Sequence, residues 1–130
     1  MKSKSNKHSI LEIKDWPHFF QTIRSRPPMY LGNASITALF HFIDGFKYSE
    51  QIHKVNSNKR FNGFSFEKFE EWVDSEFNKR KLAVRSFHLA KIKAKSEEKA
   101  FTLWFQWYDT YMAKSQKSKL KTINPIRNYP

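Results

Sequence analysis

Cysteine is absent from this 130-residue sequence, and glycine is scarce, with only three residues. Without thiols the chain has no disulfide framework and no thiolate chemistry or thiolate metal site, which favours a reducing compartment. Three glycines are too few for the many turns of an all-β fold. No apolar run reaches the length of a membrane span, and no apolar segment of a signal peptide follows the basic start MKSKSNKHSI. We therefore expect a cytoplasmic protein that has no membrane partner.

Aromatic residues, in contrast, are abundant, with 13 Phe, 5 Tyr and 4 Trp. Because aromatic side chains bury large apolar areas, we expect an aromatic core. Helical spacing of apolar residues, Asp and Ser at cap positions, and the stop at Pro27 define the expected helices. They cover 15–25, 36–52, 65–81, 85–95 and 96–115, although the segment AKIKAK also alternates like a strand.

These features predict an all-α fold: a single compact bundle of four to five helices with an aromatic core and flexible basic termini. We place the helical domain at residues 15–113, a basic N-terminal arm at 1–14 and a loosely ordered basic C-terminal tail at 114–130.

The net charge of +12 is concentrated in the two ends and in residues 79–95, which hold seven Lys and Arg residues and no carboxylate. With Phe87 and His88 among the cations, this segment has the form of a nucleic-acid surface, in which cations meet phosphates and flat rings meet bases. Two other interpretations remain open. The segment is either a solvated lysine-rich face or a complement to an acidic patch on a protein partner.

The stretch IRSRPPMYLGNAS, residues 23–35, stands between the first two expected helices. Its RPPMYLG resembles the RPGMYIG segment of the ATPase domain of DNA gyrase B and related topoisomerases. The following ALFHFIDGF, however, lacks the Glu-x-x-x-Asn that carries catalysis and metal binding in that family, and three glycines cannot form its ATP lid. We therefore do not expect an ATPase.

From the residues alone, the same stretch predicts a helix stop followed by a rigid hinge. Met29, Tyr30 and Leu31 would then pack into the core, and Gly32 would adopt a backbone conformation that other residues disfavour. Arg24 and Arg26 would cap the C-terminus of the preceding helix or pair with Asp44 or Glu50.

A second resemblance covers residues 15–112. The order IRSRPPMYLGNASITALFHFIDGF, then FEKFEEWVDSEF, then AFTLWFQWYD resembles small bacterial proteins encoded beside toxin genes, which include immunity proteins of contact-dependent growth inhibition and related polymorphic-toxin systems. The resemblance implies that the chain binds one toxin domain and blocks it. It supplies no catalytic residue. The basic ends and RSFHLAKIKAK depart from that plan.

Few residues suggest catalysis or metal binding. His41 and Asp44 are spaced to share a helical face as a proton-transfer pair, although such a histidine is more often simply hydrogen-bonded. Four carboxylates gather on one expected helix, where they form either a metal site or a solvated side: Glu67, Glu70, Glu71 and Asp74. We expect no enzyme, no metal and no cofactor.

The predicted function is that of an immunity protein, or antitoxin, that covers a bacterial toxin domain such as a nuclease and neutralises it sterically. Its partner is expected to present an acidic surface. The alternative is a basic nucleic-acid-binding module that uses residues 79–95 and the tails. Arginine and aromatic residues dominate binding hot spots, so the candidate partner-binding residues are Arg60, Phe61, Arg80, Arg85, Phe87, His88 and Lys91.

Overall fold

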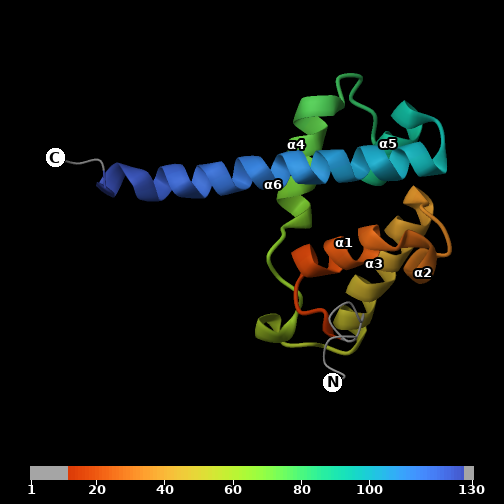
Figure 1. The fold of residues 1–130 in the computed structure, drawn as a ribbon, viewed down its shortest axis with the longest axis horizontal. Coiled ribbons are helices and arrows are strands. Elements are labelled where there is room, and N and C mark those ends of the chain that lie inside the picture. The colour runs from red at the N-terminus through yellow and green to blue at the C-terminus, as the bar shows by residue number, and fades with distance from the viewer. Residues whose placement is uncertain (1–11, 128–130) are drawn as a thin grey trace.

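The computed structural model describes the backbone of residues 12–127 and the side chains of residues 12–117. Over this range the fold is all-α, as predicted, with no strand and with one helix more than the four to five expected (Figure 1). The elements are α1 (Trp16–Ser25), α2 (Pro27–Leu31), α3 (Ile36–Ile52), η3 (Ser57–Lys59), α4 (Phe66–Phe77), α5 (Ser86–Ala94) and α6 (Glu97–Arg127).

The predicted helix starts are confirmed at their caps. The side chains of Asp15, Ser35, Ser65 and Ser96 each accept a hydrogen bond from the backbone N–H three residues further along, at 2.9–3.2 Å. Each bond satisfies one of the amide groups that the first turn of a helix leaves without an internal partner. The segment 86–94, whose pattern also resembled a strand, forms the short helix α5.

The additional helix is α2, where we expected only a stop and a hinge. Pro27 and Pro28 occupy its first two positions, where proline fits because its missing N–H would have no helical partner. Gly32 ends the helix with φ +88°, as expected for a residue in a conformation that favours glycine. Met29 does not enter the core and is 65% exposed, because a single helical turn cannot direct three successive side chains to one side.

The last helix is longer than predicted. We expected a loosely ordered tail from residue 114, but α6 continues as helix to Arg127, and Figure 1 shows its C-terminal half extending past α4 and away from the other helices. Residues 114–124 contain no glycine or proline that would stop it. No helix within residues 12–127 is long and apolar enough to cross a membrane. Residues 1–11 of the predicted N-terminal arm lie outside the described residues.

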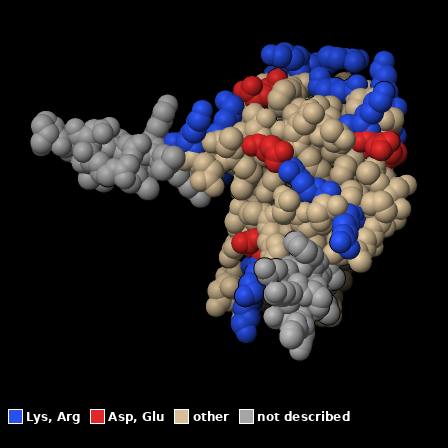
Figure 2. All heavy atoms as spheres, in the orientation of Figure 1, with Lys and Arg blue, Asp and Glu red and all other residues tan. Residues whose placement is uncertain are grey.

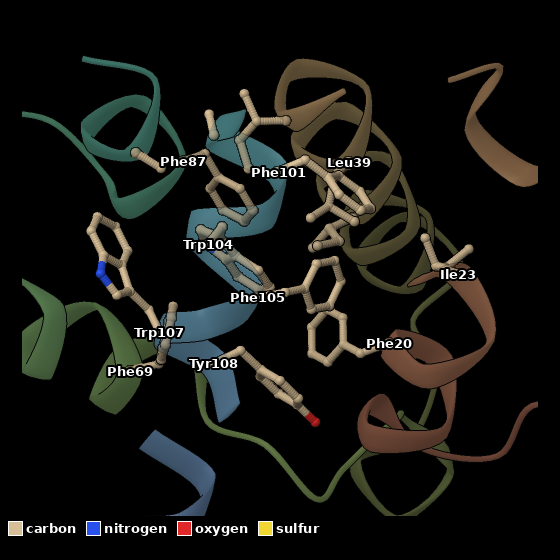
Figure 3. Close-up of a cluster of buried hydrophobic side chains, with 14 of the residues drawn as sticks. Phe20, Ile23, Leu39, Phe69, Phe87, Phe101, Trp104, Phe105, Trp107 and Tyr108 are labelled. Carbon is tan, nitrogen blue, oxygen red and sulfur yellow. The ribbon is translucent and has the colours of Figure 1, made fainter. Parts of the chain in front are cut away.

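The core is organised around Trp104 of α6, whose side chain is fully buried (Figure 3). Its ring centroid lies 5.1–6.1 Å from those of five other aromatic residues, which come from α1, α4, α5 and α6: Phe20, Phe69, Phe87, Phe105 and Tyr108. Such pairs stabilise by roughly 0.5–1.5 kcal/mol each beyond the area that they bury. One residue therefore joins four helices.

Hydrogen bonds among Glu70, Ser86 and Trp104 join α4, α5 and α6 to one another. The Ser86 backbone N–H and hydroxyl donate to the two carboxylate oxygens of Glu70, at 2.7 and 2.6 Å, and the Trp104 indole N–H donates to the Ser86 hydroxyl at 2.9 Å. Glu70 thereby caps the N-terminus of α5, where a negative charge is favourable. It is thus not part of a merely solvated side, in contrast to the exposed Glu67 and Glu71 on the same helix.

We predict that Trp104→Ala lowers the free energy of unfolding by about 3–5 kcal/mol, because it removes the shared ring and leaves a cavity. Urea unfolding followed by circular dichroism measures the change. Met29→Ala is the matched control at an exposed site, with an expected change within about 0.5 kcal/mol. A loss below about 1 kcal/mol for Trp104→Ala would contradict this description of the core.

Candidate binding surface

Two hollows adjoin along one side of α3. The first, which we name the α3–α5 groove, has a volume of about 430 Å³ and is lined by Ile36, Thr37, Phe40, Ala83, Val84, Arg85, Phe87, His88 and Lys91. The second, the α3–loop groove, has a volume of about 530 Å³ and is lined by Trp16, Asp44, Lys47, Tyr48, Glu50, Gln51, Arg60 and Phe61. The α3 residues in the two sets recur every three or four positions, so they share one helix face. We call the two grooves together the α3 face.

Arg85 lies at the junction of the two grooves. Its Nη1 is 3.7 Å from Oδ1 of Asp44, with both side chains about half exposed. Its guanidinium carbon lies 5.0 Å from the ring centroid of Phe40 and 5.6 Å from that of Phe87. Cation–π attraction therefore holds the arginine over an aromatic floor. The pair of Arg24 with Asp44 that was considered from the sequence does not form, because Arg24 bonds Asp109 at 2.8 Å instead.

A carboxylate closes one end of the α3–α5 groove. Glu97, from the start of α6, accepts hydrogen bonds from the Thr37 backbone N–H (2.9 Å), from the Thr37 and Ser35 hydroxyls (2.8 Å each) and from the Lys91 ammonium group (3.1 Å). Hydrogen bonds lower the pKa of Glu97 to about 2, and the bond from the Thr37 backbone N–H is the largest cause. Glu97 is therefore ionised at neutral pH and holds Lys91 in place.

The α3–loop groove carries both signs of charge. The Lys47 ammonium nitrogen lies 4.3 Å from the Phe66 ring centroid, and burial, with nearby Arg85 as a second cause, lowers the pKa of Lys47. Arg60 donates from Nε to the Val55 carbonyl at 2.8 Å. On the rim, Tyr48 is 64% exposed and offers a large ring to a partner.

Phe61 anchors the loop that lines this groove. Its backbone N–H donates to Oε2 of Glu50 at 3.1 Å, and its ring centroid lies 4.6 Å from that of Phe46 and 5.2 Å from that of Trp16. These contacts hold the loop between η3 and α4 against α3 and α1. Arg60 and Phe61 therefore shape the groove as well as lining it.

The structure brings six of the seven predicted binding residues to the α3 face. Arg85, Phe87, His88 and Lys91 line the α3–α5 groove, while the other two, Arg60 and Phe61, line the α3–loop groove. Phe87 is only 4% exposed and stacks on Trp104 at 5.1 Å, so its ring is part of the core as well as the groove floor. Arg80 lines neither groove, because it lies on the exposed loop between α4 and α5.

The cations of residues 79–95 therefore divide into two sets. Arg85 and Lys91 face the α3–α5 groove, whereas Figure 2 shows a gathering of Lys and Arg over the α4–α5 loop and α5. The exposed cations of these segments, which we name the cationic edge, are Lys79, Arg80, Lys81, Lys93 and Lys95. The sequence pattern did not reveal this division, because it depends on the turn that begins α5.

The two residues considered as a proton-transfer pair, His41 and Asp44, make separate contacts. His41 is exposed on α3 with its ring centroid 5.1 Å from that of Phe40, and Asp44 is paired with Arg85. Among the described residues, no three His, Cys, Asp or Glu side chains come close enough together to hold a metal ion.

Comparison with known proteins gives no match: no protein-family model, no curated protein and no solved structure matches the chain. Two surfaces of the described residues are candidates for binding a partner. The α3 face is hollow, partly aromatic and mixed in charge, whereas the cationic edge is exposed and carries one sign of charge.

We predict that the contribution of Glu97 to stability disappears in acid. Its folded-state pKa of about 2 lies below the ordinary value of 4.5, so ionised Glu97 stabilises the fold above pH 4.5 and this contribution is lost as the pH falls toward 2. The side chain is 40% exposed, and solvent screening therefore limits the effect to on the order of 1 kcal/mol.

Glu97→Gln should lose that amount at pH 7 in urea unfolding and almost none near pH 2, relative to the unaltered protein. Glu98→Gln is the control, because Glu98 is the exposed neighbour on the same turn of α6. An equal loss from Glu97→Gln at both pH values would contradict the assignment.

Proposed function

We propose that the chain is an immunity protein, which binds a bacterial toxin domain through the α3 face and blocks it by covering its active site or substrate groove. The observation that carries the proposal is the α3 face itself. Adjoining hollows with an arginine over aromatic rings, beside the exposed Tyr48 and Ile52, provide the residue types that dominate protein-binding hot spots. The resemblance of residues 15–112 to immunity proteins supports the choice of partner.

Mixed charge favours a protein partner over nucleic acid at this surface. Asp44 and Glu50 lie in the α3–loop groove beside Lys47 and Arg60, and their carboxylates would repel a phosphate backbone. Phe87, the ring expected to stack on a base, is buried against Trp104. Stacking on exposed rings is a main source of affinity for single strands, and this ring cannot supply it.

An inhibitor that acts by covering its partner needs a large contact area and no catalytic residue. A standard complex buries roughly 800 Å² on each partner. The net charge of +12 makes an acidic toxin surface the best complement, because opposite charges raise the association rate and the specificity. If the toxin is a nuclease, the inhibitor would therefore contact acidic residues beside its basic nucleic-acid groove.

The cationic edge supports a second candidate function, a nucleic-acid-binding module. Its cations are exposed, and no carboxylate interrupts residues 79–95. Phosphate contacts of this kind need no hollow and no aromatic residue. The two candidates therefore use different surfaces and can be separated by mutation.

We predict that the chain co-purifies with the toxin domain encoded next to its gene, and that Tyr48→Ala weakens this complex at least tenfold. Tyr48 is an exposed ring on the rim of the α3–loop groove, and loss of such an anchor removes roughly 1–2 kcal/mol or more of binding. Met29→Ala is the matched control, since Met29 is as exposed but lines neither groove; it should change the Kd by less than about threefold.

Isothermal titration calorimetry measures both values. The proposed surface is contradicted if the toxin domain does not bind at all. It is also contradicted if the complex survives Tyr48→Ala but is lost with Met29→Ala.

A salt titration separates the two candidate functions. A duplex held by 6–10 phosphate contacts loses on the order of 10³–10⁵ in affinity between 50 and 200 mM salt. We expect the toxin complex to lose less than about tenfold over the same range, because packed contacts in a protein interface are screened far less. Replacing Lys79, Arg80 and Lys81 together by serine should leave the toxin Kd within about threefold. Tight RNA or DNA binding that this triple variant abolishes, without any toxin binding, would favour the second function instead.

A further inference from the structure

The α3–α5 groove has a charge pattern that the proposed function does not by itself require. We propose that it is a carboxylate pocket: it receives an Asp or Glu side chain of the toxin domain, with a neighbouring aromatic side chain of the same segment packed over Phe40. This inference rests on the proposed function and names the chemistry that the partner must present.

The lining of the groove is cationic on an apolar floor. Arg85, His88 and Lys91 are its charged or titratable lining side chains. Two carboxylates border the groove without being among its lining residues: Glu97 beside Lys91 and Asp44 beside Arg85. The floor includes Phe40 and Phe87 from two different helices. An acidic side chain next to an apolar one complements both parts of the groove.

Arg85 is placed to bind a carboxylate directly. Its guanidinium group has five N–H donors in a fixed fork that matches two carboxylate oxygens. The contact with Asp44 is 3.7 Å, which is too long for a hydrogen bond. Contacts to the Phe40 and Phe87 rings restrain the guanidinium group, so little freedom is lost when a partner binds.

The opposite end of the groove already holds a carboxylate of this chain. Glu97 accepts hydrogen bonds from the backbone N–H and hydroxyl of Thr37 and from the ammonium group of Lys91. An incoming carboxylate therefore binds at the Arg85 and His88 end.

The dimensions suit a short extended segment. The lining residues of α3 run from Ile36 to Gln51, a length of about 22 Å along the helix axis. An extended chain covers this length with about seven residues. Such a segment would meet Arg85 near its middle, where the two grooves adjoin, and would meet Tyr48 in the α3–loop groove.

The experiment uses the ¹⁵N-labelled full chain and two dipeptide probes, N-acetyl-Asp-Phe amide and N-acetyl-Asn-Phe amide, which differ only in the carboxylate. At about 10 mM, NMR titration detects complexes of millimolar Kd. We expect the Asp probe to shift the amide signals of Thr37, Arg85 and His88 saturably, with a Kd at least fivefold lower than that of the Asn probe. Arg85→Gln should abolish this preference, and Arg80→Gln, on the α4–α5 loop, should preserve it.

His88→Gln is a second variant at an exposed position of the groove. It should reduce the preference by at least twofold and keeps the test valid if Arg85→Gln proves unstable in a thermal melt.

Several results would overturn the inference. These are equal affinity for the two probes, shifts confined to residues 79–81, no saturable shift at all, or inorganic phosphate at equal concentration displacing the Asp probe. Association of the chain with itself, in which an acidic α4 face of a second copy fills the groove, would also overturn it; light scattering of the free chain detects this.

The inference and the proposed function fail separately. If the toxin complex forms but neither probe binds, the proposed function stands and the carboxylate pocket is contradicted. Asp-selective binding of the probe, without any toxin complex, retains the pocket and removes the toxin as its partner.

Discussion

The hydrogen bonds that join Glu70, Ser86 and Trp104 are the constraint on which the binding surface depends. Ser86 is 1% exposed, and a buried polar group that loses its partner costs about 1–3 kcal/mol, so the three side chains hold α4, α5 and α6 in one arrangement. Phe87 follows Ser86 directly, and its ring is thereby placed on Trp104. Arg85 precedes Ser86 and is left at the surface, above the groove. The core therefore fixes the floor of the α3–α5 groove, and Ala83, Val84 and Arg85 of the loop before α5 complete its lining.

The sequence predicted the local features of the fold well, because their causes are local. The predicted caps at Asp15, Ser65 and Ser96 depend on a side chain and an amide three residues away. The prolines end α1 at Ser25, as predicted, but they also begin α2, because proline fits the first positions of a helix. The predicted end of α6 was wrong: the basic stretch after residue 113 continues as helix to residue 127.

Contacts between distant segments could not be predicted from one sequence. Arg24 meets Asp109, 85 positions away, and Glu97 meets Ser35 and Thr37 some 60 positions away. Neither pairing has a spacing that a local pattern could reveal. The candidate site was predicted in part for the same reason: Arg85, His88 and Lys91 are near in sequence and share a groove, whereas Arg80, equally near, lies on a different surface.

Hydrogen exchange of the full chain with and without the toxin domain tests the central claim most directly, because it reports where the partner lies without any mutation. The account predicts new protection on α3 and at residues 60–61 and 83–91, with residues 79–81 unchanged. Protection confined to residues 79–81, or none on α3 in a complex that demonstrably forms, would contradict it.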